Sequence, residues 1–174
     1  MTTQPTRSRV GEGDWHRGHE GLENPMDVET KVKLTAPCGI DCFNCELFEA
    51  NITVAVRDRI AAAFKRAPET VTCKGCRAQG NCSVLDEPCA TRACVGQKGV
   101  DYCFECAEFP CRRLMPLAAG ADRRPHNFKV YNLCRMKAVG VARWAEREAD
   151  DVRLRYFKGT FKIGAGPLLP GDGG

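Results

Sequence analysis

The chain is short of histidine, of long apolar runs and of strand-like alternation, and each shortage excludes a class of protein. Only three of its 174 residues are histidine. The first residues hold no apolar stretch of the signal-peptide kind, and no run approaches the roughly 20 apolar residues that span a bilayer. We therefore expect a cytoplasmic protein, in a compartment where thiols stay reduced.

The residue patterns of common enzymes are also missing. No serine is framed by glycines, and Gly96-Gln-Lys-Gly99 is too short to cradle a phosphate. A nucleophile and base pair would have to combine a cysteine with His126, whose place is typical of a solvated histidine at a helix start. His16 and His19 lie in the N-terminal segment. The sequence therefore favours a protein that is not an enzyme.

Cysteine, in contrast, is abundant. Eleven of the twelve cysteines fall within one stretch at short spacings, several of them Cys-x2-Cys. A two-residue gap lets a tight turn bring both sulfurs to one ion, and a thiolate set without histidine selects zinc or an iron–sulfur cluster. A disulfide scaffold would require an oxidising compartment. The predicted metal ligands are Cys38, Cys42, Cys45, Cys73, Cys76, Cys82, Cys89, Cys94, Cys103, Cys106 and Cys111.

Basic residues lie among these cysteines, although the formal net charge is only +4. That charge is too small to indicate a nucleic-acid partner, and no aromatic and basic interleaving marks a base-stacking surface. A four-thiolate zinc site carries a charge of about −2 that nearby cations offset. We interpret the basic residues first as charge compensation, and we expect a protein partner before a nucleic acid. They are Lys74, Arg77, Arg92, Lys98, Arg112 and Arg113.

The composition predicts one domain with two tails. Residues 1–27 and 161–174 are rich in glycine and poor in residues that could be buried, so we expect a disordered N-terminal tail and a flexible C-terminal tail around a metal-binding domain at 28–160. Met26 precedes the first segment expected to be ordered, and it is a candidate for the true start of translation.

Helical periodicity appears in the domain outside its most cysteine-rich part. Apolar residues at helical spacing predict a helix over about 48–67, ended by Pro68, and a second one from Pro125 to a stop at Gly140. A short helix over 141–150 would bury Trp144, and residues 152–156 fit an edge strand or a continued helix. Residues 73–111 are expected to form loops and turns. The predicted fold is mostly α, with irregular metal-stabilised loops and few or no strands.

The cysteine groups resemble a known family. Pro37-Cys38-Gly-Ile-Asp-Cys42-Phe-Asn-Cys45, Cys73-Lys-Gly-Cys76 and the groups at 89–94 and 103–111 are similar, in order and spacing, to the bacterial and archaeal family called domain of unknown function 3795. The resemblance extends over about 36–150, and it implies zinc binding but no particular activity. Cys82 and Cys134 depart from the family pattern, and Asp86 stands where members often have cysteine. Cys134, on an apparent apolar helix face, is predicted to be a small core residue.

Three readings of the metal remain open at this stage. The first hypothesis is that two or three zinc ions have a structural role, because Cys-x2-Cys units are typical of zinc knuckles. On this hypothesis the protein recognises another macromolecule. The rival is a redox or oxidant-sensing protein with [4Fe–4S] clusters, although the clustered ferredoxin run is absent. Metal storage or delivery would need thiolates left open. The Cys-x3-Cys-x2-Cys spacing of the first group also occurs in radical S-adenosylmethionine enzymes, but this chain lacks the length and strands of their barrel.

Overall fold

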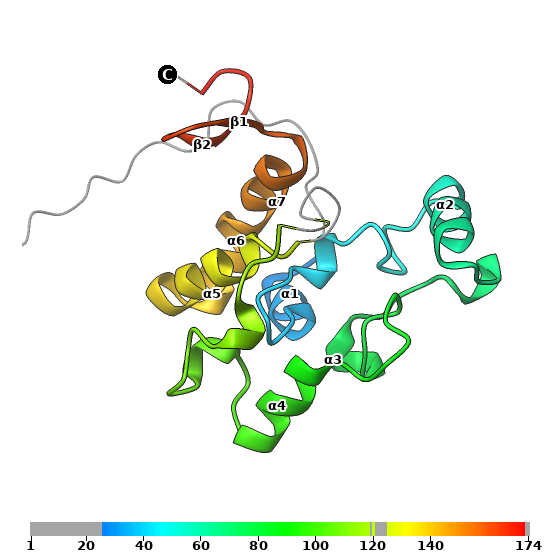
Figure 1. Cartoon of the computed structure of the whole chain (residues 1–174), viewed down its shortest axis with the longest axis horizontal. Coiled ribbons are helices and arrows are strands. Elements are labelled where there is room, and N and C mark those ends of the chain that lie inside the picture. The colour runs from blue at the N-terminus through cyan, green and yellow to red at the C-terminus, as the bar shows by residue number, and fades with distance from the viewer. Residues whose placement is uncertain (1–25, 119, 121–124, 173–174) are drawn as a thin grey trace, which may run out of the picture.

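A computed structural model describes residues 26–118, 120 and 125–172, and it is mostly helical, as the sequence predicted (Figure 1). The α-helices are α1 (Val28–Leu34), α2 (Val54–Phe64), α3 (Cys76–Gln79), α4 (Ala90–Lys98), α5 (Phe128–Val139), α6 (Val141–Arg147) and α7 (Ala149–Lys158). Short 3-10 turns are η1 (Cys42–Asn44), η2 (Pro68–Thr70), η3 (Cys103–Glu105) and η4 (Arg112–Leu114). Two strands, β1 (Thr160–Lys162) and β2 (Gly166–Leu168), form one antiparallel hairpin. No helix of the described part is long and apolar enough to cross a bilayer.

The main core surrounds Trp144, which is fully buried as predicted. Helix α6 carries Trp144 and packs against both α1 and α5. The edge of the Trp144 ring meets Phe43 of η1, with the ring centroids 6.4 Å apart. Lys31 of α1 lies over the Phe43 ring, with its Nζ 5.7 Å from the ring centroid. The first cysteine loop is therefore packed directly onto the C-terminal helices.

Helix α5 ends at Gly140, as predicted, but it buries a different face from the expected one. Gly140 has φ +89°, and its N–H donates to the Met136 carbonyl at 2.9 Å. The buried face contains Leu133 and Met136, whereas Tyr131 and Cys134 are exposed, so the prediction that Cys134 is a core residue is wrong. The reason is a polar core residue that an apolar pattern overlooks: Asn132 is buried because its Nδ2 donates to the Gly39 carbonyl at 2.8 Å.

Residues 152–156 belong to helix α7, so the edge-strand alternative is wrong and the helix continuation is confirmed. Asp150 and Asp151 lie in the first turn of α7, and Arg155 and Lys158 lie in the last, which matches the helix dipole at both ends. Arg155 also pairs with Asp151 one turn away, at 2.7 Å. These short-range charge effects outweigh the alternating apolar pattern.

Helix α2 is shorter than the predicted 48–67 segment. It begins after Thr53, whose side chain accepts a hydrogen bond from the Val56 N–H at 3.2 Å, and Lys65 in the left-handed conformation ends it. Phe48 instead forms an isolated parallel bridge with Cys73. Helix α2 covers a second, smaller apolar cluster made by Leu47, Ala61, Val71 and Cys73.

Residues 73–111 contain two helices that the sequence did not predict, α3 and α4. The nine residues of α4 include a single buried side chain, Val95, so the helix shows no apolar stripe. The rest of this segment consists of turns, as expected.

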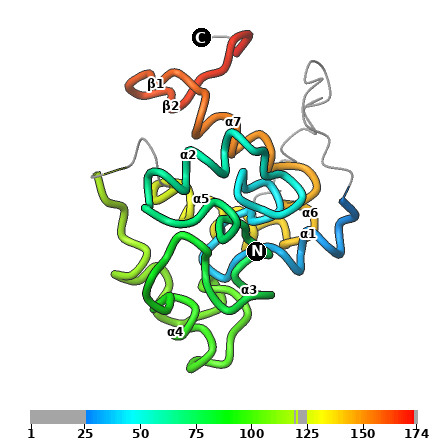
Figure 2. Tube along the Cα trace, turned by 90° about the vertical axis from the view of Figure 1, so that its right-hand side faces the viewer, coloured from blue at the N-terminus to red at the C-terminus, as the bar shows by residue number. Residues whose placement is uncertain are grey.

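The hairpin of β1 and β2 lies beyond the end of α7 and stands away from the other helices (Figure 2). It falls at the boundary between the predicted domain and the predicted C-terminal tail. Leu169 after the hairpin is buried, and the Asp172 carboxylate accepts hydrogen bonds from its N–H and from Arg155. Residues 1–25 of the predicted N-terminal tail, with His16 and His19, lie outside the described residues, whereas Asp27 caps α1 by accepting a hydrogen bond from the Thr30 N–H.

A buried ion pair fastens the first cysteine loop to α7. Arg153 donates to the Asp41 carboxylate at 2.7 Å, and Asp41 is completely buried. Burial raises the pKa of Asp41 to about 6, although the Arg153 guanidinium opposes this rise. Removing Arg153 would leave a buried carboxylate without its cation, which typically costs about 3–5 kcal/mol.

We expect Gly39→Ala to lower the free energy of unfolding by roughly 2–5 kcal/mol. Gly39 has φ +89°, and a Cβ there would lie 2.7 Å from the Lys129 carbonyl oxygen of α5. Gly96→Ala in α4 is the matched control, because a Cβ there meets nothing within 4 Å. It should raise stability by about 0.5–1 kcal/mol. Urea denaturation of both variants measures the difference, and equal effects would contradict the close approach of this loop to α5.

Candidate metal centre

All twelve cysteines are described, and each carries a free thiol. The eleven predicted ligands lie in three neighbouring groups, of which only one follows the order of the chain, and Cys38 of one group is also close enough to Cys103 of another for its charge to act on that thiol. We call these the central group (Cys38, Cys42, Cys76 and Cys89), the pocket group (Cys94, Cys103, Cys106 and Cys111) and the triad (Cys45, Cys73 and Cys82).

The central group joins the first cysteine loop to α3 and to the start of α4. The thiols of Cys42 and Cys76 are hydrogen bonded to each other. Gly75, just before Cys76, has φ +85°, a backbone conformation that favours glycine, and a Cβ there would lie in ordinary contact, 3.7 Å, with the Cys42 Cβ. Besides burial, negative charge on Cys76 or Cys89 raises the pKa of the Cys38 thiol, because these thiols lie near one another.

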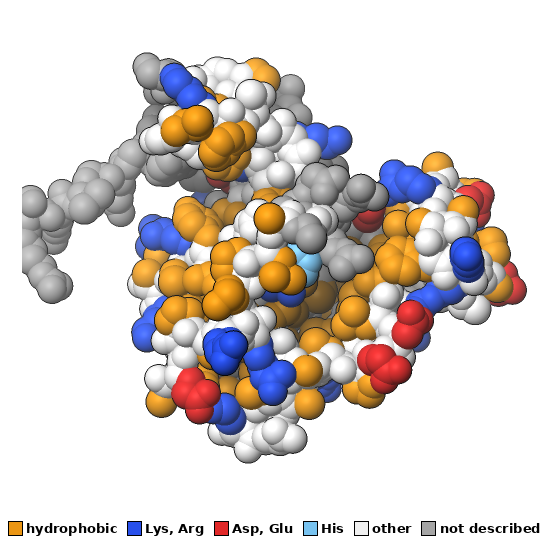
Figure 3. Space-filling view, in the orientation of Figure 1, with side chains coloured by type: hydrophobic (Ala, Val, Ile, Leu, Met, Phe, Trp, Pro, Cys, Tyr) orange, Lys and Arg blue, Asp and Glu red, His pale blue; other side chains and the backbone are white. Residues whose placement is uncertain are grey.

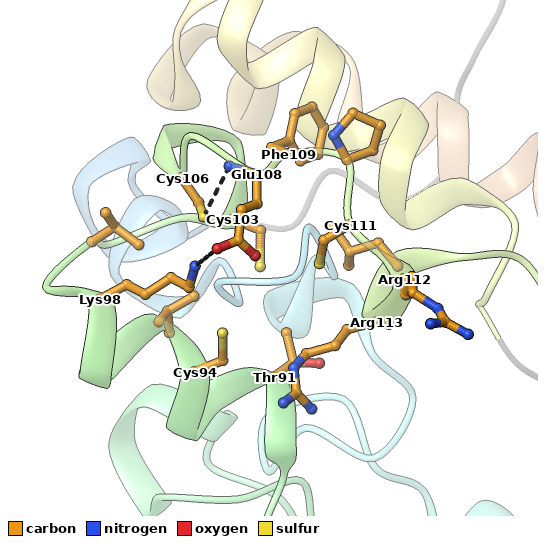
Figure 4. Close-up of a pocket in the computed structure, with 14 residues that line it drawn as sticks. Thr91, Cys94, Lys98, Cys103, Cys106, Glu108, Phe109, Cys111, Arg112 and Arg113 are labelled. Carbon is orange, nitrogen blue, oxygen red and sulfur yellow. Dashed lines mark hydrogen bonds and ion pairs between the residues drawn. The ribbon is translucent and has the colours of Figure 1, made fainter.

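The pocket group lines a hollow of about 530 Å³ between α4 and the loop that carries η3 and η4 (Figure 4). Cys94 projects from α4 toward Cys103 and Cys111, which project from the opposite loop. Glu105 holds this loop by accepting hydrogen bonds from the N–H groups of Asp101 and Tyr102, at 2.8 and 3.0 Å. All four thiols of the pocket group line this one hollow.

The triad lies beside the second apolar cluster, under α2. Cys73 is part of that cluster, and Cys45 and Val84 pack against it. The N–H of Glu49 donates to the Cys73 carbonyl at 2.9 Å, which holds the segment after Cys45 beside Cys73. Besides burial, negative charge on Cys73 or Cys45 also raises the pKa of the Cys82 thiol.

Five of the thiols share one backbone arrangement, in which the sulfur accepts a hydrogen bond from the N–H two residues later. The Gly75 N–H donates to the Cys73 sulfur and the Glu108 N–H to the Cys106 sulfur, each at 3.4 Å. The other three pairs are Cys38 with Ile40, Cys45 with Leu47 and Cys82 with Val84. Such N–H groups stabilise negative charge on sulfur and orient it, as outer partners of metal ligands do. Each of the three groups contains at least one of these turns.

Burial makes the uncomplexed thiols poor acids. It raises the pKa of Cys103 to about 12 and that of Cys82 to about 11, and it also raises the pKa values of Cys38 and Cys45. In the hydrogen-bonded pair, the Cys42 thiol donates to Cys76, which raises the pKa of Cys42 and lowers that of Cys76. Ionising several thiols in such a space requires a cation, and binding a metal ion would release their protons.

Lys and Arg side chains lie near the thiols, but only some of them are the basic residues that stand among the cysteines in the sequence. Arg92 and Arg77 stabilise the Cys76 thiolate, and Lys98 is close to Cys106 while pairing with Glu108 at 2.5 Å. Lys129 of α5 acts on Cys38 and Arg153 of α7 on Cys45. These last two are distant from the cysteines in the sequence, so no local pattern could have found them. Lys and Arg side chains also gather on the surface over the loop after α4 (Figure 3).

The donor chemistry fits a soft metal, while the side-chain positions are not those of a closed site. As the side chains stand, no set of three or more His, Cys, Asp or Glu groups among the described residues could hold a metal ion. A change between staggered χ1 rotamers moves a cysteine sulfur by roughly 3 Å. The thiol-only donors and their N–H partners are of the chemical kind that suits zinc or an iron–sulfur cluster.

Cys134 and His126, which were not predicted to be metal ligands, belong to none of the three groups. Cys134 is exposed on α5 and belongs to none of them. His126 is half-buried just before α5.

The cysteine-rich part of the chain matches a known family. Residues 34–116 match the family described as protein of unknown function (DUF3795), which confirms the resemblance over this segment. The match includes all eleven predicted ligands and stops before α5, so the expected similarity of the C-terminal helices is not part of it. No curated protein and no solved structure matches the chain.

The three groups predict how paired substitutions change metal content. If each four-cysteine group holds one zinc ion, Cys94→Ser/Cys111→Ser should lower the zinc count by about one, because both thiols belong to the pocket group. Cys38→Ser/Cys111→Ser removes one thiol from each of two groups, and it should lower the count by about two. Native mass spectrometry measures both counts, with Cys134→Ser as control. The same loss in both double variants would contradict the grouping.

Proposed function

We propose that this protein is a cysteine-rich domain held together by structural zinc, working in a reducing compartment such as the cytoplasm. The observation that carries the proposal is the gathering of eleven thiols into three groups, each with backbone N–H groups directed at sulfur. A thiol hydrogen bonded in this way is prepared to carry negative charge next to a metal ion. Disulfides would not need these donors.

A structural role for the metal follows from what the groups connect. The central group would link the first loop to α3 and α4, and the pocket group would link α4 to the loop that follows it. Between Lys74 and Cys94 no side chain is a buried member of either apolar cluster. This stretch has too few buried apolar residues to hold its shape alone, so metal binding would supply the missing free energy.

Zinc is the metal that the donor set supports best, and an iron–sulfur redox protein is the alternative. Closed four-thiolate sites formed from tight turns are typical of structural zinc. Iron–sulfur clusters use the same ligands, and N–H bonds to sulfur adjust their potentials. The two metals differ in electronic structure, which makes them simple to tell apart.

Anaerobically purified protein is expected to be colourless and electrochemically silent, with about two or three zinc ions per chain. Zinc has a filled d shell, so it gives no visible absorption and no one-electron chemistry. Elemental analysis and an absorption spectrum of the same sample are the measurement. A brown protein that dithionite bleaches would overturn the zinc assignment and establish the iron–sulfur alternative.

Chelation of the metal is expected to open the cysteine-rich segment while the C-terminal helices stay folded. Amide hydrogen exchange should rise most across residues 74–89, where no side chain is a buried member of an apolar cluster. Helices α5 and α6 provide the internal control, because Trp144, Leu133 and Met136 keep their apolar contacts without metal. Unchanged protection of residues 73–111 in metal-free, reduced protein would exclude a structural role for the metal.

We further propose that the zinc-stabilised fold presents a surface to another protein. The hairpin carries two strongly exposed apolar side chains, Phe161 at 76% and Ile163 at 88% exposure, well away from the cysteine groups. Hydrophobic side chains are visible on this part of the surface in Figure 3. Exposed apolar side chains grouped on a projecting element are typical of contact sites for proteins.

Photo-crosslinking in cells tests this contact. Benzoylphenylalanine at position 163 should give a discrete protein adduct whose yield Phe161→Ser lowers by roughly tenfold, since apolar anchors carry most of the binding energy of an interface. Position 54 on α2 is the matched control, because Val54 is also exposed, at 63%. Adducts no more abundant at 163 than at 54, or adducts to nucleic acid, would contradict a protein-binding hairpin.

A further inference from the structure

The two strands of the hairpin have unequal outer edges. Within the described part of the chain, the sheet consists of β1 and β2 alone, so each strand has one edge without a strand partner (Figure 2). Such an edge carries N–H and C=O groups that can pair with another strand, and proteins usually cover or interrupt it. Only one of the two edges is protected in this way.

The outer edge of β2 is the protected one. Pro167 stands in the middle of this strand and has no N–H to donate to a further strand. Its carbonyl oxygen accepts a hydrogen bond from Arg155 of α7, at 3.4 Å. A Cβ on Gly159, the residue after α7, would lie 2.9 Å from the Pro167 Cβ, so β2 is packed closely against the end of this helix. A strand from outside therefore cannot pair with β2.

The outer edge of β1 is open. Phe161 lies opposite Pro167, and because proline cannot exchange two hydrogen bonds with its partner, this pair is of the non-hydrogen-bonded kind. The N–H and C=O of Phe161 therefore point away from β2. The C=O of the neighbouring Lys162 points the other way, because it accepts from the Ala165 N–H of the connecting turn at 3.0 Å. Phe161 thus presents one donor, one acceptor and an exposed ring to an added strand.

The hairpin is fixed to α7, which holds this edge in place. Arg155 donates to the Asp172 carboxylate at 3.2 Å, and to Asp151 of its own helix at 2.7 Å. Leu169, directly after β2, is buried. An edge that is already formed loses little conformational entropy when it binds another strand.

We propose that the protein contacted by the hairpin, in the function proposed above, is a second copy of this chain. The β1 strands of the two copies pair antiparallel about a two-fold axis at Phe161. In this register Phe161 lies opposite Phe161 of the second copy, and their outward N–H and C=O groups exchange two hydrogen bonds. The two hairpins then form one continuous antiparallel sheet.

The side chains of β1 suit this register. A two-fold interface brings the same patch together twice, so the patch has to be complementary to itself. Lys162 lies opposite Thr160 of the second copy, so the two lysines do not face each other. Ile163, one residue further, lies opposite Gly159, where a side chain is absent. The two Phe161 rings form an aromatic cross-strand pair, which stabilises a sheet. A strand from a different protein would not require this self-complementarity, so a second copy is the favoured partner.

The paired surface is small, so we expect a weak dimer that forms with rising protein concentration. Sedimentation velocity of the full chain in reducing buffer, from roughly 10 µM to 1 mM, should show a monomer–dimer equilibrium. Isotope-filtered NMR of mixed labelled and unlabelled chains should place the Thr160 Hα beside the Lys162 Hα of the second copy, because residues of a non-hydrogen-bonded pair approach most closely.

Charge substitutions at position 160 test the register. Thr160→Glu places a carboxylate opposite Lys162 at two symmetrical positions, and it should lower the dimer dissociation constant by roughly three- to tenfold. Thr160→Lys places like charges there and should raise the constant by a similar factor. Val54→Glu and Val54→Lys on α2 are the matched controls, because they change the charge equally at an exposed position and should leave the constant unchanged. Thr160 is also exposed, and far-UV circular dichroism confirms that each variant is folded.

The outcomes separate this proposal from the proposed function. A chain that stays monomeric over the whole concentration range would overturn the self-pairing, and equal effects of Glu and Lys at position 160 would overturn the register. Photo-adducts at position 163 that contain a different protein, from a monomeric chain, would leave the protein contact intact and overturn its assignment to a second copy. A monomeric chain without any protein adduct would overturn both.

Discussion

The fold depends on how the first cysteine loop is anchored to the C-terminal helices. The anchor combines an apolar contact, a hydrogen bond and an ion pair: Phe43 packs on Trp144, Asn132 donates to the Gly39 carbonyl, and Arg153 pairs with Asp41. These contacts come from α6, α5 and α7 respectively, so three helices fix one short loop. Burial strengthens each polar contact, because water cannot compete for the partners.

This anchored loop organises the rest of the cysteine-rich segment. Its thiols Cys38 and Cys42 are arranged with the central group, and Cys45 is directed to the triad. The Cys103 N–H also donates to the Pro37 carbonyl at 2.9 Å, which docks the pocket-group loop onto the same segment. Each group of thiols therefore shares the rigidity of the helical core, even where its own surroundings contain few apolar side chains.

Electrostatics and packing act together around the thiols. Burial disfavours isolated thiolates, while the N–H donors and the cations Arg92, Lys129 and Arg153 favour them. An environment balanced in this way suits thiolates that share a dication better than thiolates that stand alone.

The sequence by itself identified the cysteine-rich segment, the helical class and several helix ends. Cysteine spacing identified the family that residues 34–116 match, and Gly140 and Trp144 were correctly placed because their effects are local. The sequence did not predict helix α4, because this helix has a single buried residue. It also did not predict the buried face of α5, because that face includes the polar Asn132. The partition of eleven thiols into three groups, and the cations Lys129 and Arg153 beside them, were decided only by the tertiary structure. The physical reason is that the central group and the triad join the first loop to segments far along the chain, and spacing along a sequence carries no information about such distant contacts.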